Sequence, residues 1–309
     1  MTAASVMTLL QTALELGLIS SLTVLSLFLS YSMLNVCDLS TDGCFTLGAA
    51  VGAVVAISGH PFLSIPAAMG AGMLSGLTTA FLQTKMGIDS LLSGIIVNTG
   101  LYSVNIAVMG NSSLLNMNKT ETVFTKAKGV LSGTFLDGKQ TVLVALAAVA
   151  LVILFLSLFL TTRLGLAIRA TGNNPDMVRS SSINTATMTL IGLCISNSFT
   201  GLSGCLLAQS QKSVNIDIGS GMLTVSLASL LIGRAFMGRG RIPFRAAGAV
   251  VGAFIFRLVY TIALRFNMPA FMLKLVSSVI VIIAIAGPYL KSQIPLMRRR
   301  LSTRQGKGA

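Results

Sequence analysis

The sequence predicts an all-α membrane protein, a polytopic helix bundle of about 8–10 membrane segments in a single domain, residues 1–309. Hydrophobic residues make up 53% of the 309 residues and charged residues only 10%, with a mean hydropathy of +0.85. Soluble domains carry about 25% charged residues. Apolar runs of about 20 residues recur between short polar breaks, which favours membrane helices over the alternating strands of a barrel.

The positive charge of the chain fits a membrane protein better than a nucleic-acid-binding one. The formal net charge is +14, but the basic residues lie in short loops and in the C-terminal tail 291–309. Membrane proteins concentrate Lys and Arg on the cytoplasmic side. We therefore expect a cytoplasmic tail, contact with membrane lipid, and no nucleic-acid partner.

The first half of the chain contains four apolar segments, at Glu15–Leu34, Thr46–Ser58, Phe62–Gln83 and Ser90–Met109. The second segment follows a polar break, Asn35–Phe45, and its roughly 13 residues are too few for a crossing of about 30 Å. We expect a broken or re-entrant segment here, because irregular backbone inside a membrane must face protein or a cavity.

Five further apolar segments follow, at Thr141–Thr161, Met188–Ala208, Met222–Gly233, Ala246–Leu264 and Phe271–Leu290. The third of these is again short. The arginines of the polar stretch 163–187 place it in the cytoplasm together with the tail. The loop Gly110–Lys139 then lies outside, although its four lysines run against that rule. The side of the N-terminus stays open, because a re-entrant second segment would reverse it.

Glycine pairs with the spacing G-x-x-x-G recur in the apolar segments. They are Gly48/Gly52, Gly72/Gly76 and Gly248/Gly252. This spacing lets helix backbones approach closely, so we expect tight helix packing at these positions.

Within the stretch 163–187, three consecutive residues predict the start of a short helix. Asn174 suits the N-cap, Pro175 the first helical position, and Asp176 the first turn. We expect a helix from Pro175 to Ser182. The local residues agree equally well with a helix that docks a partner protein and with a solvated loop.

Sequence motifs of enzymes are missing. The chain has one histidine, His60, and neither H-E-x-x-H nor G-x-S-x-G. The segment Gly233–Gly240 has the glycine spacing of an ATP-binding P-loop, but Arg and Gly replace its Lys and hydroxyl residue. The four cysteines form no C-x-x-C pair and are expected to be buried hydrophobic residues. We expect no catalytic residue, metal site or cofactor.

Four polar residues are candidates for lining a translocation pathway. Arg257 lies within an apolar segment, where it could meet a carboxylate or another anion on the pathway. The alternative is a structural role, in which it pairs with backbone carbonyls or extends outward to the membrane surface beside Arg265. Asp38 and Asp42 either line the pathway or bind a coupling cation. The alternative is a capping role, with Asp42 as the N-cap of the half-helix that follows it. Asn98, in the fourth segment, is the remaining candidate.

Two stretches together resemble a known family. Gly165–Ala208 begins GLAIRATGNNPDMVRSSSIN and resembles the cytoplasmic coupling region of the branched-chain amino acid and ribose type of ABC importer permease. Ile232–Phe256 resembles the second signature of that family, and Asp38–Ser40 its broken second helix. Ser182 and Arg234 depart from the pattern, because the family usually has Gly at both positions.

The resemblance implies a permease without an ATP site in a bacterial plasma membrane. It would work as a dimer of permeases, expected to be a homodimer, with a cytoplasmic ATPase dimer and an extracytoplasmic solute-binding protein. Relatives of this type carry amino acids, aromatic ones included. By resemblance, the coupling residues would be Arg169, Thr171, Asn174, Pro175, Asp176 and Arg179. The alternative is an ion-coupled secondary transporter, which would require titratable groups at mid-membrane and often contains an internal repeat.

Overall fold

The computed structural model describes residues 3–131, 139–237 and 240–265, together with residues 275, 278–282 and 286. The first half contains α1 (Ala3–Leu27), a π-helical turn (Phe28–Met33), α2 (Thr41–Ile57), α3 (Ser64–Thr84), α4 (Ser90–Val108) and α5 (Val123–Leu131). The second half contains α6 (Gln140–Phe159), α7 (Arg163–Asn173), α8 (Pro175–Ser180), α9 (Thr185–Gln211), α10 (Met222–Met237) and α11 (Ile242–Arg265). The predicted tail 291–309 and most of the predicted segment Phe271–Leu290 lie outside the described residues.

The prediction of an all-α membrane bundle is confirmed. Six described helices are long and apolar enough to cross a membrane, and α2 and α10 are shorter apolar helices. The strands β1 (Leu114–Asn116) and β2 (Ser213–Asn215) form an antiparallel pair, with Leu115 opposite Val214. The two short helices correspond to the two segments that the sequence marked as short.

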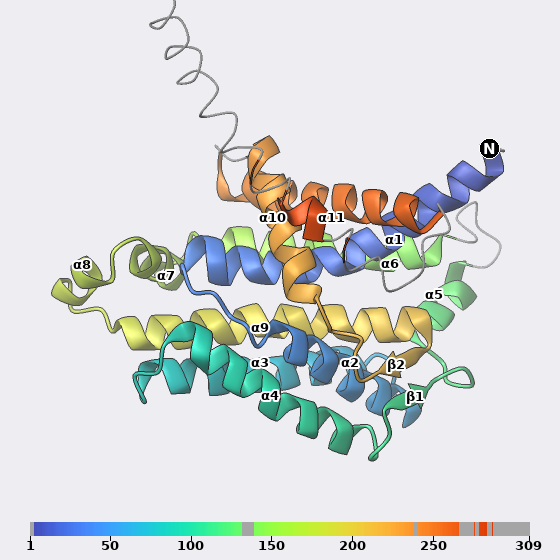
Figure 1. The fold of residues 1–309 in the computed structure, drawn as a ribbon, viewed down its shortest axis with the longest axis horizontal. Helices are drawn as coiled ribbons and strands as arrows, with labels where there is room; N and C mark the ends of the chain where they lie inside the picture. The colour runs from blue at the N-terminus through green and yellow to red at the C-terminus, as the bar shows by residue number, and fades with distance from the viewer. Residues whose placement is uncertain are drawn as a thin grey trace, which may run out of the picture.

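Two long helices, α1 and α9, form the centre of the bundle. They are 78% and 83% buried along their apolar windows, whereas α3, α4 and α6 are at most 33% buried. The helices α2 and α3 pack on α9, and α6 and α11 pack on α1 (Figure 1). In a membrane the outer helices can expose apolar side chains to lipid, so only the central pair needs to be surrounded by protein.

The bundle has two distinct ends along its long axis. The helices α7 and α8 lie at one, which we call the α8 end (Figure 1). The strands, α5 and the start of α1 lie at the other, the strand end. The stretch 163–187 and the described part of the loop, residues 110–131 and 139, are therefore at opposite ends, and α1 begins at the end where that loop lies.

The polar break after α1 is shorter than the sequence indicated. Asn35 adopts a left-handed conformation, φ 58°, and ends the helical run, and α2 begins at Thr41 and not at Thr46. Asp38 accounts for the difference, since its Oδ1 accepts the N–H of Ser40 at 2.8 Å and nucleates the first turn. Residues 34–40 therefore form the non-helical connection.

The start of α2 lies deep in the bundle. The amide of Asn197 donates to the Asp38 carboxylate at 2.6 Å. Asn197 lies about 18 Å along α9 from its first residue at 1.5 Å per residue, which is near the middle of that helix. From there α2 runs beside α9 toward the strand end, with Gly48 against Gly201 and Gly52 against Cys205. The helix α2 therefore spans only half of the bundle.

Close glycine contacts set the spacing of the other helices. Gly72 and Gly76 of α3 pack on the backbone carbonyls of Asn197 and Leu193 in α9. Gly252 of α11 likewise packs on backbone atoms of α10. A side chain at any of these glycines would overlap the neighbouring backbone. The predicted packing role of the glycine pairs is confirmed.

Candidate functional site

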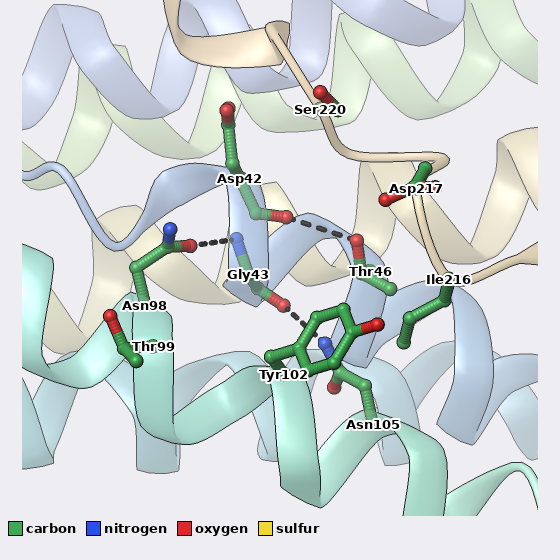
Figure 2. Close-up of a pocket in the computed structure, with 10 residues that line it drawn as sticks. All are labelled: Asp42, Gly43, Thr46, Asn98, Thr99, Tyr102, Asn105, Ile216, Asp217 and Ser220. Atoms are coloured by element: carbon green, nitrogen blue, oxygen red, sulfur yellow. Dashed lines mark hydrogen bonds between the residues drawn. The ribbon is translucent and has the colours of Figure 1, made fainter. Parts of the chain in front are cut away.

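A polar cavity of about 350 Å³ opens where α2 and α10 begin (Figure 2). Its volume lies within the range of about 300–1,000 Å³ that is common for small-molecule sites. The side chains come from α2, α4 and the connection between β2 and α10. The lining residues are Asp42, Gly43, Thr46, Asn98, Thr99, Tyr102, Asn105, Ile216, Asp217 and Ser220.

Asp42 joins the two short helices α2 and α10, which we call the half-helices, at this cavity. Its carboxylate accepts the N–H of Gly221 at 2.9 Å and of Leu223 at 2.7 Å. These N–H groups belong to the start of α10, where a helix has unpaired donors and a partial positive charge. The prediction that Asp42 is the N-cap of its own helix is wrong, because Ser40 holds that position and Asp42 caps α10 instead.

Two asparagines of α4 hold the first turn of α2 against the cavity (Figure 2). Asn98 Oδ1 accepts the N–H of Gly43 at 2.7 Å, and Asn105 Nδ2 donates to the Gly43 carbonyl at 3.2 Å. An added Cβ at Gly43 would lie 2.7 Å from Asn98 Oδ1, so a larger residue would displace the Asn98 side chain from this position. The predicted pathway residues Asn98 and Asp42 thus lie at the same cavity.

The cavity combines negative charge with hydrogen-bonding groups and one aromatic ring. Asp42 and Asp217 supply carboxylates, Thr46, Thr99 and Ser220 supply hydroxyl groups, and Tyr102 is 52% exposed. No Lys, Arg, His or Cys is among these lining residues. The arrangement lacks a nucleophile paired with a base and suits binding of a small polar solute.

The other two predicted pathway residues lie elsewhere. Asp38 is buried, with 1% exposure, and its carboxylate accepts from Ser40 and Asn197. Arg257 donates to Ser20 Oγ at 3.3 Å and lies 5.8 Å from the ring of Tyr260. Neither residue lines the cavity, and within the described part of the chain Arg257 donates to Ser20 and Met222 and forms no ion pair with a carboxylate.

The residues of the stretch 163–187 form two helices at the α8 end. The helix α7 was not predicted. Its start is capped by Thr162 Oγ1, which accepts the N–H of Gly165 at 3.2 Å. For α8 the predicted capping is confirmed: Asn174 Oδ1 accepts the N–H of Met177 at 3.1 Å, and Pro175 takes the first position. The helix ends at Ser180, and Ser182 follows with a left-handed φ of 61°.

The predicted coupling residues differ in their accessibility. Asn174, Pro175, Asp176 and Arg179 are exposed, and the last two form an ion pair at 3.6 Å. Thr171 is 8% exposed and its hydroxyl donates to the Ala167 carbonyl inside α7, while Arg169 is half-buried. Val178 is 2% exposed and anchors α8, whereas Met177 is 63% exposed beside it. The outer face of α8 is therefore open to a partner.

Several cavity residues escaped the sequence analysis. Among them are Tyr102 and Asn105 of α4, and Asp217 and Ser220 before α10. One signal could have revealed the α4 residues, since Asn98, Tyr102 and Asn105 recur at helical spacing on one face of an apolar segment. The others lie in a connection whose path depends on where α10 begins.

The comparisons with known proteins agree with this architecture. A family model described as "Branched-chain amino acid transport system / permease component" matches residues 9–285. A tyrosine transport system permease protein of Clostridioides difficile (strain R20291) is 32% identical over 87% of this chain and 88% of its own length. An uncharacterized protein of Rickettsia prowazekii (strain Madrid E) is also 32% identical, over 91% of this chain and 98% of its own.

More distant relatives carry other names. A guanosine ABC transporter permease protein of Bacillus subtilis (strain 168) is 27% identical over 56% of this chain and 57% of its own length. No solved structure matches. Taken with the six apolar spans, the family match shows that this chain belongs to the branched-chain amino acid transport system permease family and is a multi-pass inner-membrane subunit of an ABC transporter.

Proposed function

We propose that this chain imports an amino acid, aromatic ones included, and that the cavity between α2 and α10 lies on the translocation pathway. The observation that carries this proposal is the meeting of two half-helices at a polar cavity inside an apolar bundle. Broken helices of transporters place their polar ends at the substrate site. The alternating-access motion would then change the relative position of these two ends.

The chemistry of the cavity supports an amino acid as the solute. Asp217 and Asp42 offer carboxylates to an α-ammonium group, and Asn98 and Thr99 offer hydrogen bonds. The exposed ring of Tyr102 can stack on an aromatic side chain. The relative named for tyrosine matches more of the chain, at higher identity, than the guanosine relative.

A second copy of the chain would complete the site. The outer face of α4 is apolar and exposed, with Leu92 at 53%, Ile95 at 51% and Ile96 at 46% exposure. On the same helix, Thr99 and Tyr102 line the cavity and are themselves exposed at the surface of the chain. Polar groups that face hydrocarbon are costly, so this face needs protein cover. A homodimer along α4 would provide it.

The coupling helices connect mechanically to the cavity. We assign the α8 end to the cytoplasm from its arginines, which puts the start of the chain outside. An ATPase dimer that docks on α8 would move α7, whose Gly172 packs on the backbone of Met33 and Leu34. This backbone leads directly into residues 34–40 and the first turn of α2. The chain therefore offers a short route from the docking face to Asp42.

Transport by proteoliposomes tests the proposal. The chain is reconstituted with its ATPase and its solute-binding protein, and uptake of tyrosine, tryptophan, leucine and guanosine is measured with ATP and without it. We expect ATP-dependent uptake of an amino acid. Uptake of guanosine alone would overturn the amino acid assignment, and uptake driven by an ion gradient without ATP would favour the secondary transporter.

A further inference from the structure

A second cavity, far more apolar than the first, lies between α3 and α6 on the surface of α9. Its volume is about 440 Å³. We call it the α3–α6 groove, and it is lined by Ile65, Met69, Met73, Val144, Ala147, Ala148, Leu151, Val152, Phe155, Ile195, Ser198, Phe199, Leu202 and Leu206. The one hydroxyl group, that of Ser198, already donates to the Ile195 carbonyl at 2.7 Å. The groove therefore presents hydrocarbon and an already bonded hydroxyl.

The length of the groove matches one leaflet of a bilayer. From Ile65 to Met73 the wall formed by α3 rises about 12 Å, and from Val144 to Phe155 the wall formed by α6 rises about 16 Å. Half of a hydrocarbon core of about 30 Å is about 15 Å. Both walls start near the strand end, because α3 and α6 begin there (Figure 1). The groove thus spans the leaflet on that side.

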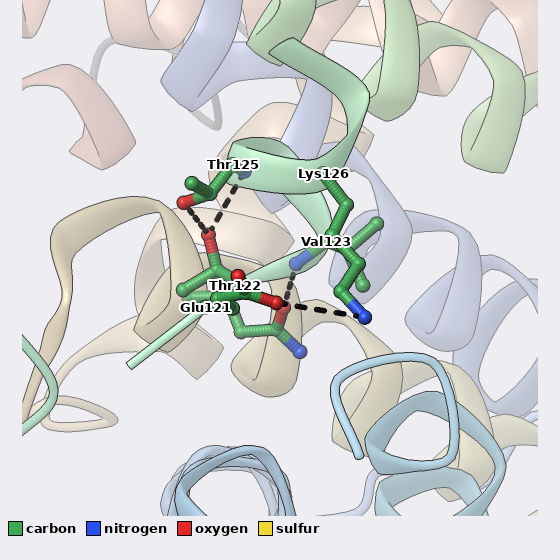
Figure 3. Close-up of polar contacts among 6 residues, drawn as sticks. Glu121, Thr122, Val123, Thr125 and Lys126 are labelled. Carbon is green, nitrogen blue, oxygen red and sulfur yellow. Dashed lines mark hydrogen bonds and ion pairs between the residues drawn. The ribbon is translucent and has the colours of Figure 1, made fainter. Parts of the chain in front are cut away.

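The helix α5 is fixed at the mouth of the groove by a buried glutamine. Gln209 of α9 accepts the N–H of Val123 at 2.9 Å and donates to Ser64 Oγ, at the start of α3, at 2.6 Å. Lys126 of α5 lies 5.8 Å from the ring of Phe62, which precedes Ile65 by one turn. Figure 3 shows its ion pair with Glu121, at 3.6 Å. A lysine ammonium group is therefore held at the rim of the α3–α6 groove, on the side of the strand end.

The described charges at this rim are positive on balance, because three lysines outnumber the Glu121 carboxylate that pairs with Lys126. Lys126 and Lys128 are exposed on α5, and Lys139 is exposed immediately before α6. Basic residues near a membrane surface attract anionic lipid headgroups. Headgroup contact would also account for lysines in a loop on the side where the positive-inside rule disfavours them.

We propose that the α3–α6 groove binds one acyl chain of an anionic phospholipid, whose phosphate lies at Lys126. The chain is an inner-membrane protein, so lipid surrounds this face, and a polar solute would find no unpaired group in the groove. The groove has about the length of the hydrocarbon chains of one leaflet.

Native mass spectrometry of the full chain, extracted in mild detergent, tests the apolar half of the site. Wild-type protein is expected to retain one phospholipid per chain. Ala148→Phe fills the groove and should abolish this retention, whereas Ala150→Phe, on an exposed position of α6 outside the lining, should keep it. Equal retention by both variants would overturn the proposal. A photoreactive residue placed at Leu151 gives a second test, and its crosslinking to protein and not to lipid would also overturn the proposal.

Headgroup preference tests the charged half and does not depend on the folding of Ala148→Phe. Delipidated protein is titrated with phosphatidylglycerol or phosphatidylcholine, and the thermal unfolding temperature is recorded. We expect wild-type protein and Lys85→Gln, a matched change at the other end, to gain several degrees more from phosphatidylglycerol. Lys126→Gln should respond equally to both lipids. An unchanged preference in Lys126→Gln would show that Lys126 does not bind the headgroup.

Discussion

The carboxylate of Asp42, in the first turn of α2, accepts the backbone N–H of Leu223, in the first turn of α10, at 2.7 Å. Because the second carboxylate oxygen accepts from Gly221, one side chain satisfies two donors of a helix start that lies about 180 residues away in the chain. A charged acceptor at a helix N-terminus is stabilising both as a hydrogen-bond partner and through the helix dipole. Asp42 therefore locks two half-helices to each other beside the cavity.

Removing this carboxylate should loosen the contact between the half-helices. For Asp42→Ala we expect the free energy of unfolding to fall by about 1–3 kcal/mol, the cost of leaving buried hydrogen-bond donors without a partner. Asp42→Asn keeps an acceptor and should lose less. Thermal unfolding in detergent measures the change, with the exposed Asp217→Ala as the control. Equal stability of Asp42→Ala and Asp217→Ala would contradict the locking role.

Glycines of one helix should differ sharply in their tolerance of a methyl group. A Cβ at Gly72 would overlap the carbonyl of Asn197, whereas a Cβ at Gly70 would meet nothing within 4 Å. We expect Gly72→Ala to destabilise by roughly 1–3 kcal/mol, as overpacking does. Gly70→Ala should be neutral or slightly stabilising, because Ala favours helices. Comparable unfolding temperatures for the two variants would show that α3 and α9 can separate without loss.

The left-handed backbone at Ser182 predicts a stabilising substitution. A residue with a Cβ at φ 61° carries strain that Gly does not. Ser182→Gly should therefore raise the free energy of unfolding by up to about 1 kcal/mol, and Ser182→Val should lower it. The preceding turn residue provides a control, since Ser181→Gly removes a side chain without relief of positive φ. A gain in Ser181→Gly and none in Ser182→Gly would refute the strain argument.

A charge on the exposed face of α8 should uncouple transport from ATP hydrolysis. Met177 is 63% exposed between Asp176 and Val178. We expect Met177→Glu to lower ATP-driven uptake roughly tenfold, equivalent to about 1.4 kcal/mol of lost coupling, with normal insertion in the membrane. Met86→Glu, at a methionine that is 61% exposed at the same end, is the matched control. If both variants transport normally, α8 does not carry the coupling contact.

The ring of Tyr102 should contribute to the affinity for an aromatic solute. Tyr102→Leu removes a stacking partner worth about 0.5–1.5 kcal/mol, so the apparent KM for uptake should rise. Tyr102→Phe keeps the ring and should transport nearly normally. Val104→Leu changes a neighbouring exposed position outside the cavity and should have no effect. An unchanged KM in Tyr102→Leu would remove this ring from the proposed site.

Local features were predictable wherever their interactions are local in sequence. The cap at Asn174 bonds a residue only three positions ahead, so adjacent residues predict it. The family pattern also marked Ser182 as unusual, and the reason is its left-handed φ. In contrast, α7 was missed because its 11 residues carry two glycines and two arginines and lack the length and apolarity that mark the membrane helices.

The composition and the apolar runs by themselves determined a helical membrane protein with two short segments, because a lipid solvent imposes length and hydrophobicity on each helix separately. Which residues share the cavity was decided only by the tertiary structure. From the sequence, Asp42 fits the N-cap position of its own helix. In the structure its hydrogen-bond partners are the N–H groups of Gly221 and Leu223. Asp217 reaches the cavity because the start of α10 lies beside α2, and Asn98 and Tyr102 reach it because α4 packs on α2. Both contacts are set by packing between distant segments.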